Sequence, residues 1–422
     1  MEGTIALSRR EIHRAAVLGE VARKAMTLKE AAEFMRVSYR HAKRVNRRYE
    51  REGLPGLANR ARGRPAHNAI GSDLRTRILD LHDQKYRGFN DTHFAEMLDE
   101  EEHIVVSRES VRKVLRLAGK PPKRKRLPPR HRSRRSRKPR RGIMAQWDGS
   151  PHHWFGPDRP PCCLLTAVDD ADSSLLAALF VKAECAVGYL RLLDMMLRNH
   201  GAPLSIYQDR HTIHERSDDH WSIEEEIQGV RFPTHLGRVL LELGIEPIPA
   251  YSPQAKGRIE RSFGTLQDRL VAELALRGIT DIDTANPWLE DTFIERCNKR
   301  FARKPAQEGS AFRTVSKRDR YTRIGFAYEA TVANDNCVRL GGLAIDVPPG
   351  PQRRSYARAK VIVRQHLDGA WSVWYHDRQI AAHPPTKLRE PLRSWKRRAP
   401  GDPKGARQMI QVYLSSRPAP LP

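Results

Sequence analysis

The chain has 422 residues, a formal net charge of +26 at pH 7 and 39 % hydrophobic residues. This length predicts several domains, and the hydrophobic content excludes a wholly disordered chain. Residues 1–142 hold 37 Lys and Arg against 17 Asp and Glu, so 37 − 17 = +20 of the charge lies in the first third. This asymmetry favours a front end that binds a polyanion, while the more balanced, apolar-rich remainder argues against a ribosomal or purely architectural protein.

Cysteine usage and apolar runs bear on the cellular compartment. The five cysteines are an odd number without the spacing of a disulfide framework, which fits a reducing cytosol. No apolar run reaches 18 residues, and the first residues lack the core of a signal peptide. We therefore expect a soluble, cytoplasmic protein.

Residues 27–49 have the pattern of a helix-turn-helix. Thr27 and Glu30 have the spacing of a capping box, a break at 36–38 separates two helices, and Ala42 and Val45 face inward on the second. The opposite side of that helix carries four cations and no acid, namely Arg40, Lys43, Arg44 and Arg47. We predict a DNA-binding domain over 1–66 with this face in the major groove. The alternative is an ordinary solvated charged face.

The pattern recurs over 67–119, which we predict as a second, winged-helix-like helix-turn-helix domain. Helices are expected at 72–84, 91–99 and from Ser107 to Gly119. The basic residues that face outward on the last of these are Arg112, Lys113 and Arg116. Residues 120–141 carry 13 Lys and Arg, five prolines and no acid, which predicts an extended linker that becomes ordered on phosphates. The same composition also suits a nuclear-localisation signal.

After residue 142 the sequence pattern changes to one that alternates predicted strands and helices, as in a mixed α/β fold. Two short segments, 143–148 and 204–209, look like strands that end in an acid, and 162–183 looks like an apolar hairpin. If the two strands are adjacent, Asp148 and Asp209 lie at the same edge of one sheet. In the helix that follows Ser252, residues Ile259 and Phe263 begin a buried stripe, and Glu260 lies beside that stripe.

Three converging carboxylates suit two divalent cations. Hard oxygen ligands select Mg²⁺ or Mn²⁺, and two such ions catalyse phosphodiester chemistry. The catalytic and metal-binding residues that we predict are Asp148, Asp209 and Glu260. Lys256, one helical turn before Glu260, is the candidate for a DNA contact beside the metals.

Residues 143–270 resemble the RNase H-like core that retroviral integrases share with the DDE transposases of bacterial insertion sequences. The resemblance rests on QWDGS, IYQDRH and YSPQAKGRIERSFGTLQDRL, which match the two Asp motifs and the last-helix motif. With the tandem helix-turn-helix front, the chain is most similar to ISNCY-type transposases. The resemblance implies that Asp148, Asp209 and Glu260 form the catalytic triad. Here 50 residues separate the last two, because the polar segment 214–233 lengthens the interval found in many integrases.

Other polar residues have simpler interpretations. The clustered acids Asp169, Asp170 and Asp172 suit a turn between two apolar runs. Four residues that could suggest zinc lack the spacing of a structural site, namely His152, His153, Cys162 and Cys163. His211 and His214 either support the site, contact DNA or are ordinary loop histidines, and Arg258 and Arg261 are expected on a solvated face.

The C-terminal part reads as a helical connector over 279–324, a small β-barrel over 325–395 and a basic tail over 396–422. Asp368–Gly369 predicts a hairpin turn. The expected fold is therefore multidomain: all-α helix-turn-helix domains, an α/β RNase H-like core with a mixed sheet over 142–278, and a small β-barrel.

The predicted function is that of a DNA transposase. It would bind the terminal inverted repeats of a mobile element, cut the element ends with water and join them to target DNA. The expected partners are double-stranded DNA and further copies of the chain on that DNA, in the nucleoid of a bacterial cytoplasm. Two alternatives remain open: a non-catalytic DNA-binding regulator, which would bind without cutting, and an RNase H-type nuclease, which would cut without joining.

Overall fold

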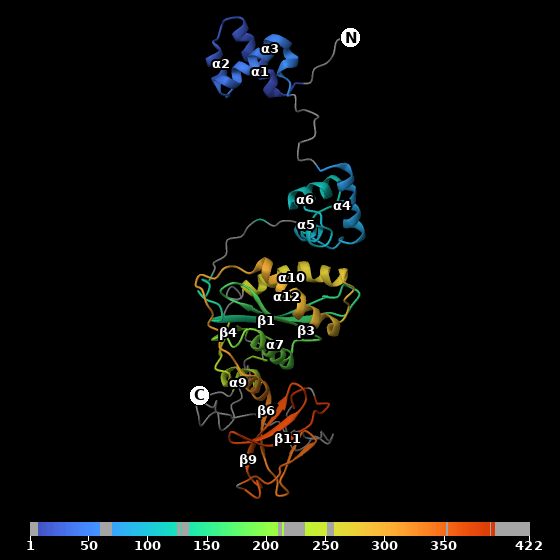
Figure 1. The fold of residues 1–422 in the computed structure, drawn as a ribbon, viewed down its shortest axis with the longest axis vertical. Coiled ribbons are helices and arrows are strands. Elements are labelled where there is room, and N and C mark those ends of the chain that lie inside the picture. The colour runs from blue at the N-terminus through green and yellow to red at the C-terminus, as the bar shows by residue number, and fades with distance from the viewer. Residues whose placement is uncertain are drawn as a thin grey trace, which may run out of the picture. The chain divides into compact units, whose positions relative to one another are not determined.

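The computed structural model describes residues 7–59, 70–124, 128, 135–209, 213–214, 233–250, 257–351, 353–388 and 390–392. The chain divides between Thr76 and Arg77 into two compact units, each of which is described by itself below (Figure 1). None of the helices in the described ranges is long and apolar enough to cross a membrane.

The first unit is helical because three hydroxyl residues cap three helices. The helices are α1 (Arg9–Ala22), α2 (Leu28–Phe34) and α3 (Tyr39–Glu52). Ser8, Thr27 and Ser38 accept hydrogen bonds from backbone N–H groups in the first turns. The expected helices of 27–49 are confirmed, including the capping box of Thr27 and Glu30. Helix α1 was not expected, although the spacing of Ser8 and Glu11 carries the same capping signal.

Helix α4 (Ser72–Gln84) crosses the division, and α5 (Asp91–Glu100) and α6 (Arg108–Leu117) follow it in the second unit, which confirms the three expected helices. Asn90 and Ser107 cap the last two. The side chains of Ile78, Phe94 and Val111 are fully buried. Residues 70–124 contain no strand.

A five-stranded mixed sheet forms the centre of the second unit. Its strands are β1 (Met144–His152), β2 (Cys162–Asp169), β3 (Leu175–Val181), β4 (Ser205–Gln208) and β5 (Glu246–Pro249), in the order β3-β2-β1-β4-β5. β1, β2 and β3 are antiparallel neighbours, whereas β4 and β5 run parallel to β1. The expected mixed sheet is confirmed. The expectation that the first strand ends at Asp148 is wrong, because pairing with β2 carries β1 on to His152.

Helices cover both faces of this sheet (Figure 1). On one face, α7 (Ala186–Asn199) and α9 (His235–Glu242) pack against Trp147 and its neighbours. On the other face lie α10 (Gly257–Leu276), α11 (Ile282–Trp288), the π-helical segment η3 (Leu289–Phe293) and α12 (Ile294–Phe301). The expected buried stripe of α10 is confirmed at Ile259, Phe263, Leu266 and Leu270.

The connector is less helical than expected. Residues 302–316 contain no helix before α13 (Lys317–Arg323) begins. Pro305 disfavours helical geometry at the residue before it. The backbone of Arg313 instead pairs with Ala202 beside β4. This segment therefore pairs with the chain just before β4.

The C-terminal strands form an antiparallel sheet. Its strands are β6 (Gly325–Thr331), β9 (Lys360–His366), β10 (Trp371–Tyr375) and β11 (Arg378–His383), in the order β11-β10-β9-β6, with a separate hairpin of β7 (Cys337–Leu340) and β8 (Leu343–Asp346). The Asp368–Gly369 turn joins β9 to β10, as expected, with Gly369 at a φ of 90°. Closure into a barrel stays a prediction. The ring of His235 on α9 contacts Phe326 and Tyr328, so this sheet shares a core with α9.

Candidate active site at the sheet edge of β1 and β4

Asp148 lies on β1, and Asp209 directly follows β4, the parallel neighbour of β1. Met144 pairs with Ser205 and Gln146 with Tyr207, an offset of 205 − 144 = 61 residues. The two acids have the same offset, since 209 − 148 = 61. If the register continues for two residues beyond its last pair, Asp148 and Asp209 lie opposite each other on chains about 4.8 Å apart. Asp148 is half-buried and the side chain of Asp209 is 34 % exposed, which leaves both accessible to solvent.

Helix α10 carries Glu260 along the same face of the sheet. Gln267 Nε2 donates to Ser150 Oγ of β1 at 3.1 Å. Nearer its start, Arg258 pairs with Asp170, whose Oδ1 also accepts from Gln146 Nε2 at 2.6 Å. The helix therefore runs alongside β1 from the level of residue 146 to that of residue 150, which brackets Asp148.

Glu260 lies two helical turns before Gln267 on the same side of α10. Seven residues correspond to about 10 Å along the helix axis and to nearly the same direction around it. Glu260 is exposed. Within the described ranges, no three His, Cys, Asp or Glu side chains are close enough together to hold a metal ion. Asp148 and Asp209 thus lie on β1 and directly after its parallel neighbour β4, and Glu260 lies on the helix that runs along β1.

The other acids near the sheet have structural roles. Asp170 is fully buried and binds Arg135 and Arg258 as well as Gln146. Asp169 accepts from the backbone N–H groups of Gly142 and Ala171, and burial raises the pKa of its carboxyl group. These contacts place the acids in and beside the turn between β2 and β3. The expectation of a solvated Arg258 is wrong, because Asp170 draws its guanidinium against the sheet.

The end of the basic linker contacts the same turn. Arg137 Nη1 donates to the carbonyl oxygens of Asp170 and Ala171 at 3.2 and 3.1 Å and to Ser173 Oγ at 2.9 Å. The linker residues 125–127 and 129–134 lie outside the described residues, as do Lys256 and His211.

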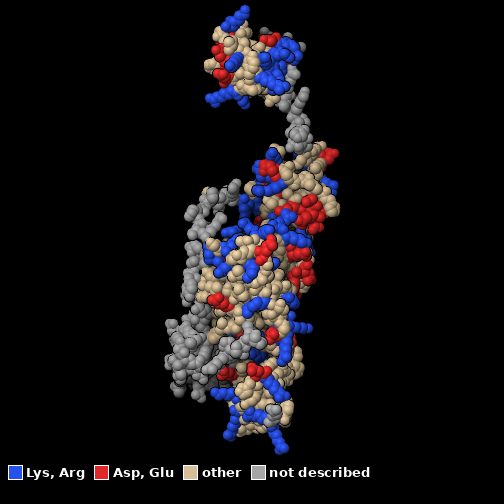
Figure 2. Space-filling model, turned by 60° about the vertical axis from the view of Figure 1, so that its left-hand side comes forward, with Lys and Arg blue, Asp and Glu red and all other residues tan. Residues whose placement is uncertain are grey.

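The basic face expected on α3 is present in the first unit. Its four cations are all exposed, namely Arg40, Lys43, Arg44 and Arg47. Ala42 and Val45 are buried on the opposite side. The pKa of His41 is lowered by partial burial and by the positive charges of Arg14 and Arg44, which shows the sign of the local field. Figure 2 shows Lys and Arg side chains gathered on one side of this unit.

The cations expected to face outward on α6 differ in their surroundings. Lys113 is exposed. Arg112 pairs with Glu109 of the same helix, with Nη2 at 2.7 Å from Oε1. Arg116 is only 25 % exposed, because it pairs with Asp91 at 2.5 Å and donates to the carbonyl oxygen of Lys120. Arg116 therefore belongs to the packing of its own domain, which its place in the helical pattern did not reveal.

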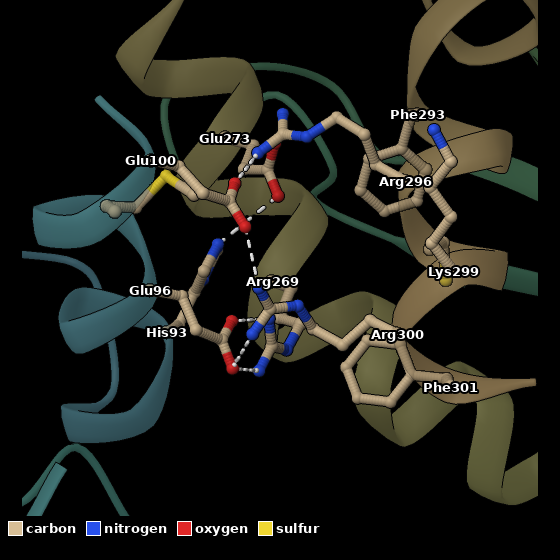
Figure 3. A pocket seen from close by; sticks show the side chains of 12 residues that line it. His93, Glu96, Glu100, Arg269, Glu273, Phe293, Arg296, Lys299, Arg300 and Phe301 are labelled. Atoms are coloured by element: carbon tan, nitrogen blue, oxygen red, sulfur yellow. Dashed lines mark hydrogen bonds and ion pairs between the residues drawn. The ribbon is translucent and has the colours of Figure 1, made fainter. Parts of the chain in front are cut away.

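A charged pocket lies between α5, α10 and α12 (Figure 3). Glu96 of α5 pairs with Arg269 of α10 and with Arg300 of α12. In the same pocket Glu273 accepts from His93 Nε2 at 3.2 Å. Because these groups satisfy one another across the three helices, the pocket is an interface that holds α5 on the core.

The comparisons with known proteins address the family. A family model described as a helix-turn-helix domain matches residues 13–66. The transposase for insertion sequence IS1202 of Streptococcus pneumoniae is 31 % identical over 326 residues, which cover 68 % of each chain. A protein of Sinorhizobium fredii that carries the name transposase y4bF is 36 % identical over 74 % of this chain and 67 % of its own. The chain belongs to the insertion-sequence transposases.

Solved structures with similarity to this chain include a viral integrase and another transposase. The transposase is similar to the catalytic core domain of HTLV-2 integrase in complex with magnesium, at 16 % identity over 35 % of this chain and 86 % of that one, with a TM-score of 0.25. It is similar to the Mos1 strand transfer complex at 15 % identity over 70 % and 96 % of the two chains, with a TM-score of 0.21. Both TM-scores are low, and the site of the transposase is described above from its own strands and helices.

Proposed function

We propose that this transposase cuts and joins DNA at a site formed by Asp148, Asp209 and Glu260, with Mg²⁺ or Mn²⁺ as cofactor. The observation that carries the proposal is the parallel pairing of β1, which contains Asp148, with β4, which Asp209 directly follows. The position of α10 along β1 supports Glu260 as the third acid.

The chemistry of the three side chains fits divalent cations. Carboxylate oxygens are the ligands that Mg²⁺ and Mn²⁺ prefer, and Asp148 and Asp209 are accessible at the sheet edge. When bound, two such ions activate an attacking water or 3′-hydroxyl and stabilise the leaving oxygen of a phosphodiester. The protein's own contribution is to hold three carboxylates, on β1, directly after β4 and on α10.

Double-stranded DNA is the proposed partner. The exposed cations of α3 suit entry into the major groove, and we assign them to the recognition of terminal inverted repeats. Lys113 and Arg112 of α6 form a second, smaller contact, and Lys256 is proposed to contact DNA beside the metals. Because two element ends are joined in one reaction, the transposase acts as a homo-oligomer on DNA.

The finer family and domain assignments are also part of the proposal. The tandem helix-turn-helix front supports an ISNCY-type transposase. We assign residues 1–66 and 67–119 to two DNA-binding domains and 142–278 to the integrase-like core. The antiparallel strands after residue 325 are proposed to close into a small barrel.

The test is strand cleavage and joining of DNA that carries the element ends, in the presence of Mg²⁺. Asp148→Asn, Asp209→Asn and Glu260→Gln should each lower both activities by about a thousand-fold, since the metal contribution amounts to several kcal/mol. Binding of the same DNA in EDTA should stay unchanged. Asp158→Asn removes an exposed carboxylate elsewhere in the unit and should be fully active.

The outcome also separates the alternatives. Full activity of any triad variant contradicts the assignment of that residue. A wild-type protein that binds end DNA but never cuts it indicates the non-catalytic regulator. Cleavage without joining, and without dependence on the end sequence, indicates the nuclease.

A further inference from the structure

A buried histidine contacts one of the two aspartates of the proposed site. His214 Nε2 lies 3.3 Å from Asp209 Oδ1, and the His214 side chain is 1 % exposed. Asp209 follows the last residue of β4 directly. Its contact with His214 is therefore a contact at the sheet end where the proposed site lies.

Two aromatic rings fix the imidazole of His214. Its centroid lies 4.5 Å from that of Tyr189 on α7, with the rings at 73°, and 5.8 Å from that of Trp147, with the rings at 27°. Both partners are fully buried in the core of the sheet. Trp147 immediately precedes Asp148 on β1, so one packed cluster supports both aspartates.

Tyr189 is in turn tied to an acid at the same edge. Its hydroxyl donates to Glu184 Oε1 at 2.6 Å. Burial raises the pKa of Tyr189, and the negative charges of Glu184, Asp148 and Asp209 raise it further.

Gly149 makes room for this arrangement. A Cβ atom at residue 149 would lie 3.0 Å from the Cδ and Oε2 atoms of Glu184 and 3.0 Å from Cys163 Sγ. A side chain here would displace the Glu184 carboxyl group, which holds Tyr189. The residue after Asp148 is therefore part of the support.

We propose that His214 is a positioning residue, which holds the Asp209 carboxylate toward Asp148 through its Nε2 atom and so prepares the site for a divalent cation. This inference rests on the proposed function of Asp209 as a metal ligand. A hydrogen bond to one oxygen of a carboxylate ligand limits its rotation before the ion binds. Because Trp147 and Tyr189 hold the imidazole of His214 in place, its contact restricts the rotation of the Asp209 carboxylate.

The test measures metal binding directly, without activity. MnCl₂ is titrated into the full-length protein, and free Mn²⁺ is followed by electron paramagnetic resonance. His214→Leu fills the space but removes the donor, and we expect Mn²⁺ affinity to fall 10- to 100-fold. His214→Gln keeps an amide donor and should restore most of the affinity. His200→Leu replaces a half-buried histidine, which contacts Phe312, and should bind Mn²⁺ like the wild type.

Cleavage provides a second readout. With His214→Leu, the Mg²⁺ concentration for half-maximal cleavage should rise by the same factor, while the rate at saturating Mg²⁺ recovers most of its wild-type value. A merely structural role would lower the rate at every Mg²⁺ concentration. If His214→Leu does not fold, His214→Asn makes the same comparison, because its shorter amide stays polar but does not span the distance to Asp209.

The outcomes separate this inference from the proposed function. Wild-type Mn²⁺ affinity in a folded His214→Leu or His214→Asn protein overturns the positioning role. Wild-type Mn²⁺ affinity in Asp209→Asn shows instead that Asp209 is not a metal ligand, and the proposed triad then fails with it. Weak binding in Asp209→Asn together with wild-type binding in His214→Leu leaves the triad intact and removes only the role of His214.

Discussion

Gln267 of α10 donates a hydrogen bond to Ser150 of β1, and this contact sets how far the helix that carries Glu260 extends along the strand that carries Asp148. Asp148 and Ser150 are two residues apart and therefore point to the same side of β1. The amide of Gln267 joins the helix to this side of the strand. The position of the third acid thus depends on a residue that takes no part in the chemistry.

We expect Gln267→Leu to lower strand cleavage about 10- to 100-fold, because a displacement of about 1 Å at the reacting groups costs roughly this factor. The loss of one hydrogen bond should destabilise the protein by only about 1 kcal/mol. Cleavage rates and thermal unfolding of the same variant separate the two effects. Thr265→Ala, which removes the hydrogen bond from Thr265 to the carbonyl oxygen of Arg261 within the same helix, is the control. Equal losses in both variants would show that the Gln267 contact has no special role.

The interface between α5, α10 and α12 predicts a loss of stability in acid. Burial tends to raise the pKa of Glu96, but the hydrogen bond from Arg269 and the positive charges of Arg269 and Arg300 outweigh it, so the pKa is lowered. A lowered folded pKa adds stability above the unfolded value of about 4.3. That stability is lost as the pH falls below about 4.3 and Glu96 takes up a proton.

Hydrogen exchange of the α5 amides between pH 7 and pH 3.5 measures this effect. Protection should drop in the wild type over the lower part of the range. Glu96→Gln should show weaker protection at pH 7 and a smaller further loss in acid. Glu308→Gln removes an exposed carboxylate that pairs with Lys304 and should behave like the wild type. An unchanged pH profile in Glu96→Gln would assign the acid sensitivity to other groups.

Local patterns were sufficient for most of the helices. The capping box of Thr27 and Glu30 and the buried stripe that begins at Ile259 depend on residues within a few turns of each other. Asp209 was placed correctly at the end of a strand for the same reason. Structural features that depend on residues close together in the sequence can therefore be predicted from the sequence alone.

Contacts between distant residues were not predictable in this way. The pairing of Arg258 with Asp170 joins residues 88 positions apart, and it changed an expected surface arginine into a buried support. β1 extends beyond Asp148 because β2 pairs with it as far as His152, which the composition of 143–148 does not reveal. The contact of His214 with Asp209 depends on the rings of Trp147 and Tyr189, which come from other elements. The sequence alone therefore could not assign a role to His214.

A buried ion pair joins the core to the C-terminal sheet and should be costly to break. Arg238 is 4 % exposed; it donates to Glu242 Oε1 at 2.7 Å and to the carbonyl oxygen of Gly325 at 2.7 Å. Arg364 of β9 pairs with the other oxygen of Glu242 at 3.1 Å. Removing one charge from such a pair costs about 3–5 kcal/mol, because the partner is left uncompensated in the interior.

Glu242→Gln should therefore lower the midpoint of unfolding in guanidinium chloride, while Glu246→Gln, an exposed change on β5, should leave it unchanged. The triple variant Arg238→Met/Glu242→Leu/Arg364→Met should recover most of the loss, because none of the three paired charges remains at the junction. If Glu242→Gln is as stable as the wild type, the pair contributes nothing to the junction.

If the exposed cations of α3 contact DNA phosphates, each should contribute to the salt dependence of DNA binding. Each Lys or Arg that neutralises a phosphate releases counterions, so the slope of log K against log salt concentration changes by about 0.9 per contact. Alanine at Arg40, Lys43, Arg44 or Arg47 should flatten the slope for end-bearing DNA by roughly that amount. Lys299→Ala removes an exposed charge on α12 that pairs with Glu295 and should not change the slope. A face of α3 that is merely solvated predicts identical slopes for all five variants, whereas DNA contact predicts that only Lys299→Ala matches the wild type.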